Sequence, residues 1–251
     1  MQISKNGSQY DSGISVVIPA FRAERHIGDT MRKIRATFGS GPKIIVVVND
    51  PLSDTLSIIK NIAREDPGVS YLYFKQRLGK GIALQEGFKA ARTSIIGFVD
   101  ADAPFPLDLI KDKLTLLDND SCDCLIFSKW KGNSFGNVRQ KFFRKCLSRV
   151  FNYIVKVLFK LEFSDTQGGA KFLKKDVFDR LGGDFLCAGF LFDLELILKL
   201  RQQDMRIKEL PIFMSGNSSS TVSITKDSWA MGKELYKLIR YFLVWARKGK
   251  K

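Results

Sequence analysis

Two carboxylates follow a short apolar run in the middle of this 251-residue chain. Residues 95–99 (IIGFV) end abruptly at Asp100 and Asp102, with Ala101 between them. In open α/β sheets, ligands bind at the carboxyl ends of the strands, so both acids would lie at such an edge. Their oxygens suit Mg²⁺ or Mn²⁺, which usually bind together with a phosphate. A solvated aspartate-rich turn explains the same residues, and an Asp-x-Asp pattern alone does not separate the two.

A second apolar run, residues 43–48 (KIIVVV), also ends in polar side chains. Asn49 and Asp50 follow it directly. Their amide and carboxylate oxygens would accept hydrogen bonds from a base or a ribose. The simpler alternative is an Asn-Asp-Pro turn that Pro51 punctuates.

Glycines and cations stand at the start of an expected helix at residues 79–92. The sequence there is Gly79-Lys80-Gly81. The N-terminus of a helix has free N–H groups and a positive partial charge, which favour phosphate. The spacing matches neither the Walker nor the G-x-G-x-x-G pattern, so the segment alone is a weak signal.

Two further groups of polar residues lie in the second half of the chain. Residues 164–169 (SDTQGG) contain Asp165 and Gln167, which would either serve a site or cap a helix end. Asp193 and Glu195 lie two residues apart in an apolar helix. Because residues at this spacing point in different directions, only one of them can easily face a cleft. The alternative is that one acid is buried and hydrogen-bonded and the other is solvated.

The composition limits the class of protein. Lys+Arg number 41 and Asp+Glu 26, a net charge of +15, which implies an anionic partner such as nucleic acid, an anionic membrane or a phosphorylated substrate. The four cysteines form no C-x-x-C pair, which indicates a reducing compartment. The polar residues 1–13 show no apolar leader, and no window offers the roughly 18 apolar residues of a membrane span.

The hydrophobic pattern predicts alternating strands and helices. Strands are expected at 14–19, 43–48, 69–74 and 95–99, with helices at 24–38, 52–64 and 79–92 between them. This alternation is typical of a mostly parallel sheet with helices on both faces. Further helices are expected at 107–117, 138–161, 190–201 and 227–246, and strands at 123–127, 171–173 and 207–213. We expect one α/β domain at residues 14–225, after a polar extension at 1–13 and before a basic amphipathic helix and tail at 226–251.

Residues 124–161 contain no acidic side chain but many basic ones. Phe143, Leu147, Val150, Phe151, Ile154, Leu158 and Leu161 form one helical stripe, which we assign to the core, while Phe142, Val155, Val157 and Phe159 lie off it. A cationic helix with surplus apolar residues is typical of a membrane interface. The end of the chain repeats this pattern, with aromatic residues before a basic tail. A pair of core helices and a solubilising tail is the alternative.

Taken together, these segments resemble the family-2 glycosyltransferases with a GT-A fold, and among them the polyprenyl-phosphate (dolichyl-phosphate) glucosyl- and mannosyltransferases. Residues 16–21 (VVIPAF) resemble the opening VVIPxY strand, 46–50 the VVDD strand end, 79–83 the GKGxA segment and 100–102 the DAD metal motif. Residues 165–171 (DTQGGAK) are similar to DTQCGFK, 192–196 to FDxEL and 209–211 to EVP. The resemblance spans residues 14–225.

The resemblance implies transfer of a hexose, with inversion, from UDP-glucose or GDP-mannose to a polyprenyl phosphate on the cytoplasmic face of a membrane. It assigns Asp100 and Asp102 to Mg²⁺ or Mn²⁺. The residues expected to bind the nucleotide are Pro19, Ala20, Phe21, Asn49, Asp50, Gly79, Lys80, Asp100 and Ala101. Those expected to have catalytic roles are Asp102, Asp165, Gln167 and Asp193. Those expected to bind the acceptor phosphate are Lys129, Arg139, Arg144 and Ser148.

Some residues depart from the family pattern. Asn49 stands where the family has an acid, Phe21 where it has tyrosine, and Pro104 where it often has a glutamine. Lys129 replaces an arginine and so keeps the charge without the two-pronged geometry. Three alternatives remain open at this point, one of them a catalytically silent relative that would bind nucleotide without turnover. A family-2 enzyme with a hydroxyl acceptor would use Asp193 or Asp165 as a base, and a non-enzymatic nucleic-acid-binding module would explain the charge alone.

Overall fold

The computed structural model describes residues 11–52, 54–103, 105–132, 142–213 and 224–248. A seven-stranded sheet has the order β3-β2-β1-β4-β6-β5-β7. Its strands are β1 (Asp11–Ala20), β2 (Lys43–Val48), β3 (Val69–Tyr73), β4 (Thr93–Val99), β5 (Cys124–Ser128), β6 (Ala170–Lys174) and β7 (Ile207–Pro211). Only β6 runs antiparallel to its neighbours, β4 and β5, which confirms the mostly parallel sheet predicted from the sequence.

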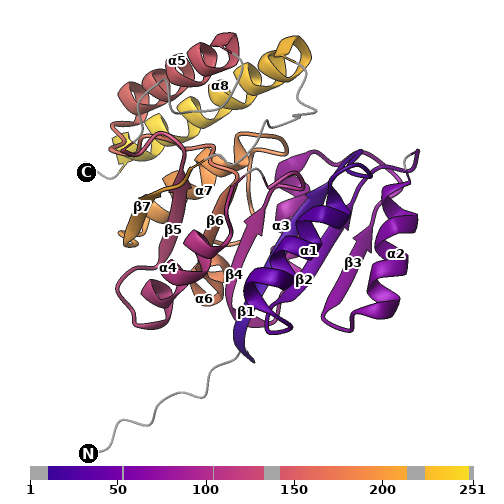
Figure 1. Ribbon diagram of the computed structural model, residues 1–251. Helices are drawn as coiled ribbons and strands as arrows, with labels where there is room; N and C mark the ends of the chain where they lie inside the picture. Colours follow the sequence, from indigo (N-terminus) through magenta and orange to yellow (C-terminus); the bar gives the residue numbers. More distant parts are fainter. Residues whose placement is uncertain (1–10, 53, 104, 133–141, 214–223, 249–251) are drawn as a thin grey trace, which may run out of the picture.

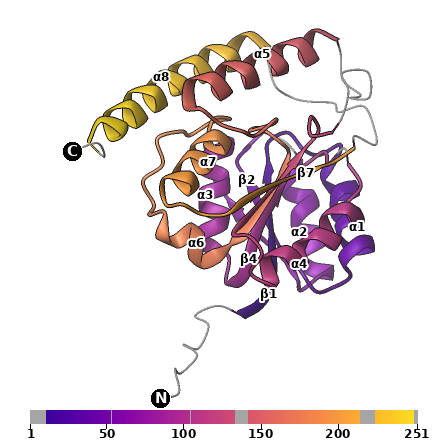
Figure 2. The ribbon, with the colours of Figure 1, turned by 90° about the vertical axis from the view of Figure 1, so that its left-hand side faces the viewer.

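Helices cover both faces of this sheet (Figures 1 and 2). On one face, α1 (Ile27–Phe38), α2 (Thr55–Glu65) and α4 (Asp108–Asp118) bury Ile34, Ile59 and Ile110 against β1, β2 and β4. On the other, α3 (Lys80–Ala90), α6 (Lys175–Arg180) and α7 (Phe192–Gln202) contribute Phe88 and Phe178 to a second core. The six-residue α6 was not predicted, because so short a helix has no clear period of its own.

The insertion of β6 beside β4 requires a glycine. A Cβ atom at Gly97 of β4 would lie 2.1 Å from the ring of Phe172 on β6. The missing side chain therefore lets the Phe172 ring lie directly on the backbone of β4. This contact holds the segment that precedes β6 against the end of β4, which Asp100 follows directly.

Two longer helices, α5 (Phe142–Phe159) and α8 (Ile224–Lys248), lie side by side at the end of the sheet where the parallel strands finish (Figures 1 and 2). Phe159 and Phe242 join them edge to face, with ring centroids 6.1 Å apart. The side of this edge formed by β5, β6 and β7 is therefore overlaid by two helices that come from distant parts of the sequence (Figure 1).

The core stripe predicted for α5 was wrong. Most of its members are exposed: Phe143, Leu147, Val150, Ile154 and Leu158. The buried face instead carries Asn152 and Val155, with Phe151 and Phe159 half-buried. The reason is that α5 has apolar residues on most of its circumference, so its sequence does not say which side meets the core. The polar Asn152 lies inward because it has a partner there, Thr166.

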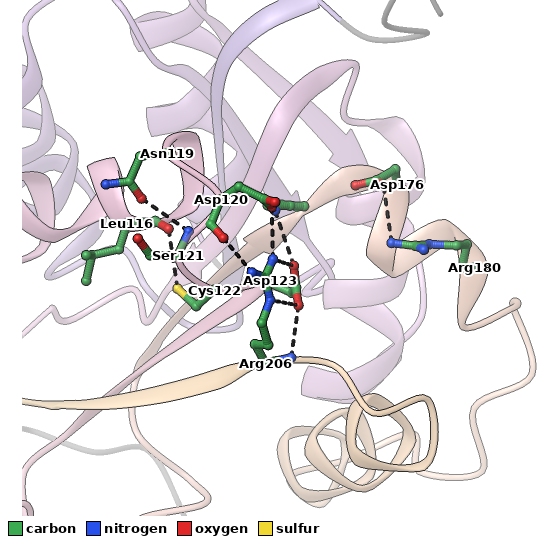
Figure 3. Close-up of polar contacts among 10 residues, drawn as sticks. Leu116, Asn119, Asp120, Ser121, Cys122, Asp123, Asp176, Arg180 and Arg206 are labelled. Atoms are coloured by element: carbon green, nitrogen blue, oxygen red, sulfur yellow. Dashed lines mark hydrogen bonds and ion pairs between the residues drawn. The ribbon is translucent and has the colours of Figure 1, made fainter. Parts of the chain in front are cut away.

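A polar cluster fastens the opposite end of the sheet, before β5 and β7 (Figure 3). Oδ2 of Asp123 accepts hydrogen bonds from the backbone N and the Nε of Arg206 at 2.9 and 3.0 Å, and Oδ1 accepts from Nη2 at 2.8 Å. These bonds hold the pKa of Asp123 well below its usual range. The cluster joins the starts of two neighbouring strands and lies away from the residues predicted to do chemistry.

Candidate active site

The ends of β1, β2 and β4 bring three of the predicted segments to one edge. The N–H of Asn49 donates to the carbonyl of Ala20 at 3.2 Å, and the N–H of Asp100 donates to the carbonyl of Gly169 at 3.0 Å. The hydroxyl of Thr30 on α1 donates to the carbonyl of Ala101 at 2.7 Å. Parallel strands finish at the same edge of the sheet, so residues that are far apart in the sequence lie close together in the fold.

Asn49 and Asp50 present buried oxygen atoms that lack hydrogen bonds. Each residue is 3% exposed. Oδ1 of Asn49 and Oδ2 of Asp50 have no hydrogen-bond partner, although Nε of Arg22 lies 3.8 Å from the latter. Leaving a buried acceptor unsatisfied costs about 1–3 kcal/mol. Both oxygens therefore suit hydrogen-bond donors of a ligand, such as the N–H groups of a base or the hydroxyl groups of a ribose.

Phe21 lies beneath two guanidinium groups, those of Arg77 and Arg22. Cζ of Arg77 is 4.5 Å from the ring centroid, and Cζ of Arg22 is 5.5 Å from it. Pro19 and Ala20 precede Phe21 at the end of β1. This edge therefore combines an aromatic face with two cations, a surface that suits a nucleotide.

The start of α3 touches the loop before α7 through its glycines. Gly79 has a φ of 84°, and a Cβ atom there would lie 2.6 Å from the carbonyl oxygen of Ala188. A Cβ at Gly81 would lie 2.6 Å from the carbonyl oxygen of Cys187. The glycines of the GKG segment thus permit backbone contact that any side chain would prevent. This contact fixes where Lys80 points.

A chain of four alternating charges runs inward from Asp100. Nζ of Lys80 lies 3.0 Å from Oδ1 of Asp100 and 3.1 Å from Oδ2 of Asp193. Oδ1 of Asp193 accepts a hydrogen bond at 2.6 Å from Lys171, whose side chain is 0% exposed and also donates to the carbonyl of Gly168 at 3.0 Å. Lys171 closes the quoted DTQGGAK motif but was given no role, because a single lysine in a short β-strand is usually solvated.

The pKa values in this chain follow from burial and charge. Burial alone would lower the pKa of Lys80, but the carboxylates of Asp100 and Asp193 outweigh it and raise that pKa. Burial alone would raise the pKa of Asp193, but Lys171 and Lys80 outweigh it and lower that pKa. Lys80 and Asp193 are therefore both charged at neutral pH. Glu195 is buried as well, and its carboxylate accepts from the N–H groups of Leu186 and Cys187, so the alternative of one buried and one solvated acid in this helix was wrong.

The segment 164–169 passes directly beside Asp100. A Cβ atom at Gly169 would lie 2.6 Å from Oδ2 of Asp100, so this position requires glycine. Asp165 is 0% exposed, and its Oδ2 lies 3.7 Å from Nζ of Lys129. Nε2 of Gln167 donates to the carbonyl of Phe190 at 3.4 Å. Three predicted residues, Asp165, Gln167 and Lys129, thus lie in one region with the acid motif.

Two residues from other elements hold this segment in place. Oε1 of Glu209 on β7 accepts from the N–H groups of Ser164 and Asp165 at 2.8 and 2.9 Å. Oδ1 of Asn152 on α5 accepts from the N–H of Thr166 at 3.2 Å. Glu209 belonged to a quoted motif without a role, and nothing in the local sequence singles out Asn152.

The residues predicted for the acceptor phosphate are only partly described. Arg139 lies outside the described residues, as does the side chain of Arg144. Oγ of Ser148 accepts a hydrogen bond from Nε1 of Trp130 at 3.2 Å, and Cζ of Arg149 lies 4.9 Å from the Trp130 ring. Ser148 therefore faces the strand end that carries Lys129, with Arg149 as an additional cation nearby.

Asp102 is the second acid after β4 and a candidate metal ligand. Burial, followed by the charge of Asp100, raises its pKa, while His26 and Lys80 act in the opposite direction. Among the described residues, no three His, Cys, Asp or Glu side chains form a complete metal cage. A magnesium or manganese ion needs only one or two carboxylates when substrate phosphates complete its coordination, so Asp100 and Asp102 fit such an ion.

A family model described as glycosyl transferase family 2 matches residues 15–182, which is most of the chain. The chain belongs to glycosyl transferase family 2. The match covers β1 to α6, and so includes the acid motif, the GKG segment and residues 164–169. It confirms the family expected from the sequence motifs.

Family-2 relatives of known name share about a quarter of their residues with this chain. The dolichyl-phosphate beta-glucosyltransferase of Saccharomyces cerevisiae is 24% identical over 242 residues, covering 88% of this chain and 72% of that protein. The glycosyltransferase AglD of Haloferax volcanii is 24% identical over 227 residues. The match covers 88% of this chain but spans only 36% of AglD.

Solved structures of other glycosyltransferases share the fold of this family-2 protein. Glucosyl-3-phosphoglycerate synthase from Mycobacterium tuberculosis, in complex with Mn²⁺, UDP and glucosyl-3-phosphoglycerate, superposes with a TM-score of 0.68 at 16% identity, covering 91% of this chain and 79% of that one. A mannosyltransferase from Pyrobaculum calidifontis, in complex with GDP-Man and Mn²⁺, gives 0.62 at 15% identity, covering 92% and 65%. The expected GT-A fold is thereby confirmed.

Proposed function

We propose that this glycosyltransferase moves a hexose from a nucleotide-diphosphate sugar to a polyprenyl phosphate, with inversion at C1. A phosphate oxygen of the acceptor attacks C1 and forms the new bond. The bond from C1 to the diphosphate breaks, and the nucleoside diphosphate leaves with the electron pair. The relative from Saccharomyces cerevisiae is named for transfer of glucose to dolichyl phosphate, which supports this acceptor class.

The observation that carries the proposal is the environment of Asp193. A hydroxyl acceptor needs a carboxylate that takes its proton, and Asp193 was one of the two candidates. Two lysines hold its oxygens at 2.6 and 3.1 Å, and its pKa is lowered, so it is a poor proton acceptor. Asp165, the other candidate, is fully buried with Lys129 beside it. A phosphate acceptor is already anionic at neutral pH and needs no such base.

The donor diphosphate would lie between Lys80 and the acid motif. Asp102, together with Asp100, would hold Mg²⁺ or Mn²⁺, which neutralises charge on the leaving diphosphate when bound. Lys80 lies 3.0 Å from Asp100 and adds a fixed positive charge on the same side. Asn49, Asp50 and Phe21 would receive the base and ribose, with Pro19, Ala20, Gly79 and Ala101 forming the surrounding backbone. UDP-glucose and GDP-mannose are both candidate donors.

The acceptor phosphate would enter from the side of α5. Lys129 and Ser148 lie there, and Arg139 and Arg144 belong to the same basic segment. Gln167 lies near the transferred sugar by this assignment, and Asp165 keeps Lys129 in place. The roles of Asp165 and Gln167 are thus to position the groups that bind substrate.

The exposed face of α5 is the proposed contact with the membrane. Phe142, Phe143, Val150, Tyr153 and Val157 are each more than half exposed. Trp229 and Tyr236 on α8 are exposed by 70% and 62%. No helix among the described residues is long and apolar enough to cross a membrane. A net charge of +15 favours binding to an anionic membrane surface. We assign this surface to the cytoplasmic face of the membrane, where a polyprenyl phosphate would present its head group.

A direct assay tests the reaction. The protein is incubated with Mg²⁺ or Mn²⁺, each of several nucleotide sugars and a polyprenyl phosphate, and the glycolipid is identified by its mass. A parallel reaction offers sugar and peptide hydroxyls as acceptors. Transfer to the polyprenyl phosphate supports the proposal. Transfer only to hydroxyl acceptors would assign the protein to the other branch of family 2.

A further inference from the structure

Glu234 reaches from α8 to the loop that precedes α7. Its Oε1 accepts a hydrogen bond from the N–H of Gly189 at 2.8 Å, and its Oε2 accepts from the N–H of Leu191 at 3.3 Å. A Cβ atom at Gly189 would lie 3.2 Å from both oxygens, so the loop fits closely against the carboxylate. The first N–H groups of a helix have no partner within it, and here a side chain from α8 supplies one.

The same loop lies directly against the donor side of the site. The carbonyl of Ala188 accepts from the N–H of Ile82 at 3.1 Å. Cβ atoms at Gly79 and Gly81 would each lie 2.6 Å from a carbonyl oxygen of this loop, that of Ala188 and that of Cys187. These are contacts between backbones, without flexible side chains to absorb a shift. A displacement of residues 187–191 would therefore move the start of α3, and Lys80 with it.

The loop also leads into Asp193. It ends at Phe192, the first residue of α7, and Asp193 follows with its carboxylate 3.1 Å from Lys80. Glu195 of α7 holds the beginning of the loop, through Leu186 and Cys187. Glu234 holds its end, and this second anchor comes from α8, the helix with exposed Trp229 and Tyr236.

We propose that Glu234 is a positioning residue, through which the placement of α8 sets the geometry of Lys80 and Asp193. The inference rests on the proposed function, because Lys80 is assigned there to the donor diphosphate. Glu234 touches neither substrate nor metal in this scheme. Its effect on the donor passes through the loop 187–191.

Nucleotide binding tests this proposal without an acceptor. Glu234→Gln and Glu234→Ala are compared with Glu65→Gln and Glu65→Ala, the same changes on exposed Glu65 of α2. Titration calorimetry gives the Kd for UDP and for GDP, each with Mn²⁺, and urea unfolding gives stability. We expect Glu234→Ala to raise the Kd about tenfold, as is typical for groups that orient a binding residue. Glu234→Gln keeps one acceptor oxygen, so a rise of about threefold is expected.

The outcomes separate the possible failures. Folded Glu234 variants that bind nucleotide as tightly as the wild-type protein would show that Glu234 has a structural role only. If Glu234→Ala does not fold, the Kd of Glu234→Gln decides in the same way. If the wild-type protein binds neither nucleotide, the donor site is misassigned, and the proposed function fails together with this inference. A graded rise from Glu to Gln to Ala, with the Glu65 variants unchanged, supports it.

Discussion

Nζ of Lys171 lies 2.6 Å from Oδ1 of Asp193, and both side chains are withdrawn from solvent. Lys80 completes the arrangement on the other oxygen of Asp193. A buried carboxylate held between two ammonium groups stays ionised and keeps its orientation. In the proposed reaction, Asp193 therefore orients Lys80 and Lys171 and does not act as a base.

Replacing Lys171 by methionine should destabilise the fold strongly. The change leaves Asp193 buried with one cation instead of two, and breaking a buried pair typically costs about 3–5 kcal/mol. Urea unfolding measures the loss. Lys175→Met is the matched control, because Lys175 pairs with the partly exposed Asp179 and should cost about 1 kcal/mol or less. Equal losses in the two variants would contradict the buried-pair account.

Replacing Asp102 by alanine should abolish metal-stimulated transfer and leave the fold intact. Removing a group that helps to neutralise the leaving diphosphate is expected to cost about 4 kcal/mol of barrier, roughly a thousandfold in rate. Turnover is measured with Mg²⁺ and with Mn²⁺, and circular dichroism serves as the control for folding. Wild-type turnover in this variant would remove Asp102 from the metal site.

Replacing Arg144 by alanine should impair use of the lipid acceptor more than donor binding. A charged hydrogen bond to phosphate contributes about 1.5–3 kcal/mol, so the KM for polyprenyl phosphate should rise at least about tenfold. Donor Kd is measured separately by calorimetry and should not change. A large loss of donor affinity with unchanged acceptor kinetics would show that the residue serves the other substrate.

A charge on the outer face of α5 should weaken membrane binding. Tyr153 is 70% exposed there, and a glutamate would oppose both apolar insertion and attraction to anionic lipid. Cosedimentation of Tyr153→Glu with anionic vesicles should fall about tenfold, and wild-type binding should weaken as salt is added. Tyr71→Glu on the edge strand β3 is the matched control. If the wild-type protein ignores anionic vesicles at low salt, the exposed face has another partner.

The cluster around Asp123 predicts a specific dependence of stability on pH. Hydrogen bonds from Arg206 hold the folded pKa of Asp123 below the value of about 4 in an unfolded chain. The contribution of ionised Asp123 to the free energy of unfolding is therefore complete above pH 5 and is lost as the pH falls through the folded pKa. Asp123→Asn should cost about 1 kcal/mol at pH 7, because Arg206 is half exposed and its pairing is screened by water. Urea unfolding at pH 7, 5, 4 and 3 should show this difference shrink only at the acidic end.

The sequence alone determined the first half of the sheet and the acids at its edge. A continuous β-branched run such as β2 is stable only when it is buried on both faces, and four short apolar segments alternate with amphipathic helices in this half of the chain. Parallel connection then brings the residues after each strand to one edge, so Asn49, Asp50, Asp100 and Asp102 were found without a structure. These features follow from local periodicity and from a general rule of topology.

Only the tertiary structure decided which polar residues meet across the fold and which way α5 faces. Lys171 and Asp193 are 22 residues apart, and Glu234 lies 45 residues from Gly189, so no local pattern pairs them. An isolated charge in an apolar segment shows its role only when its partner is known. On α5, apolar residues lie on nearly every side, and burial of Asn152 and Val155 was settled by the loop and the sheet that this helix covers. Long-range contacts, rather than propensity, chose that face.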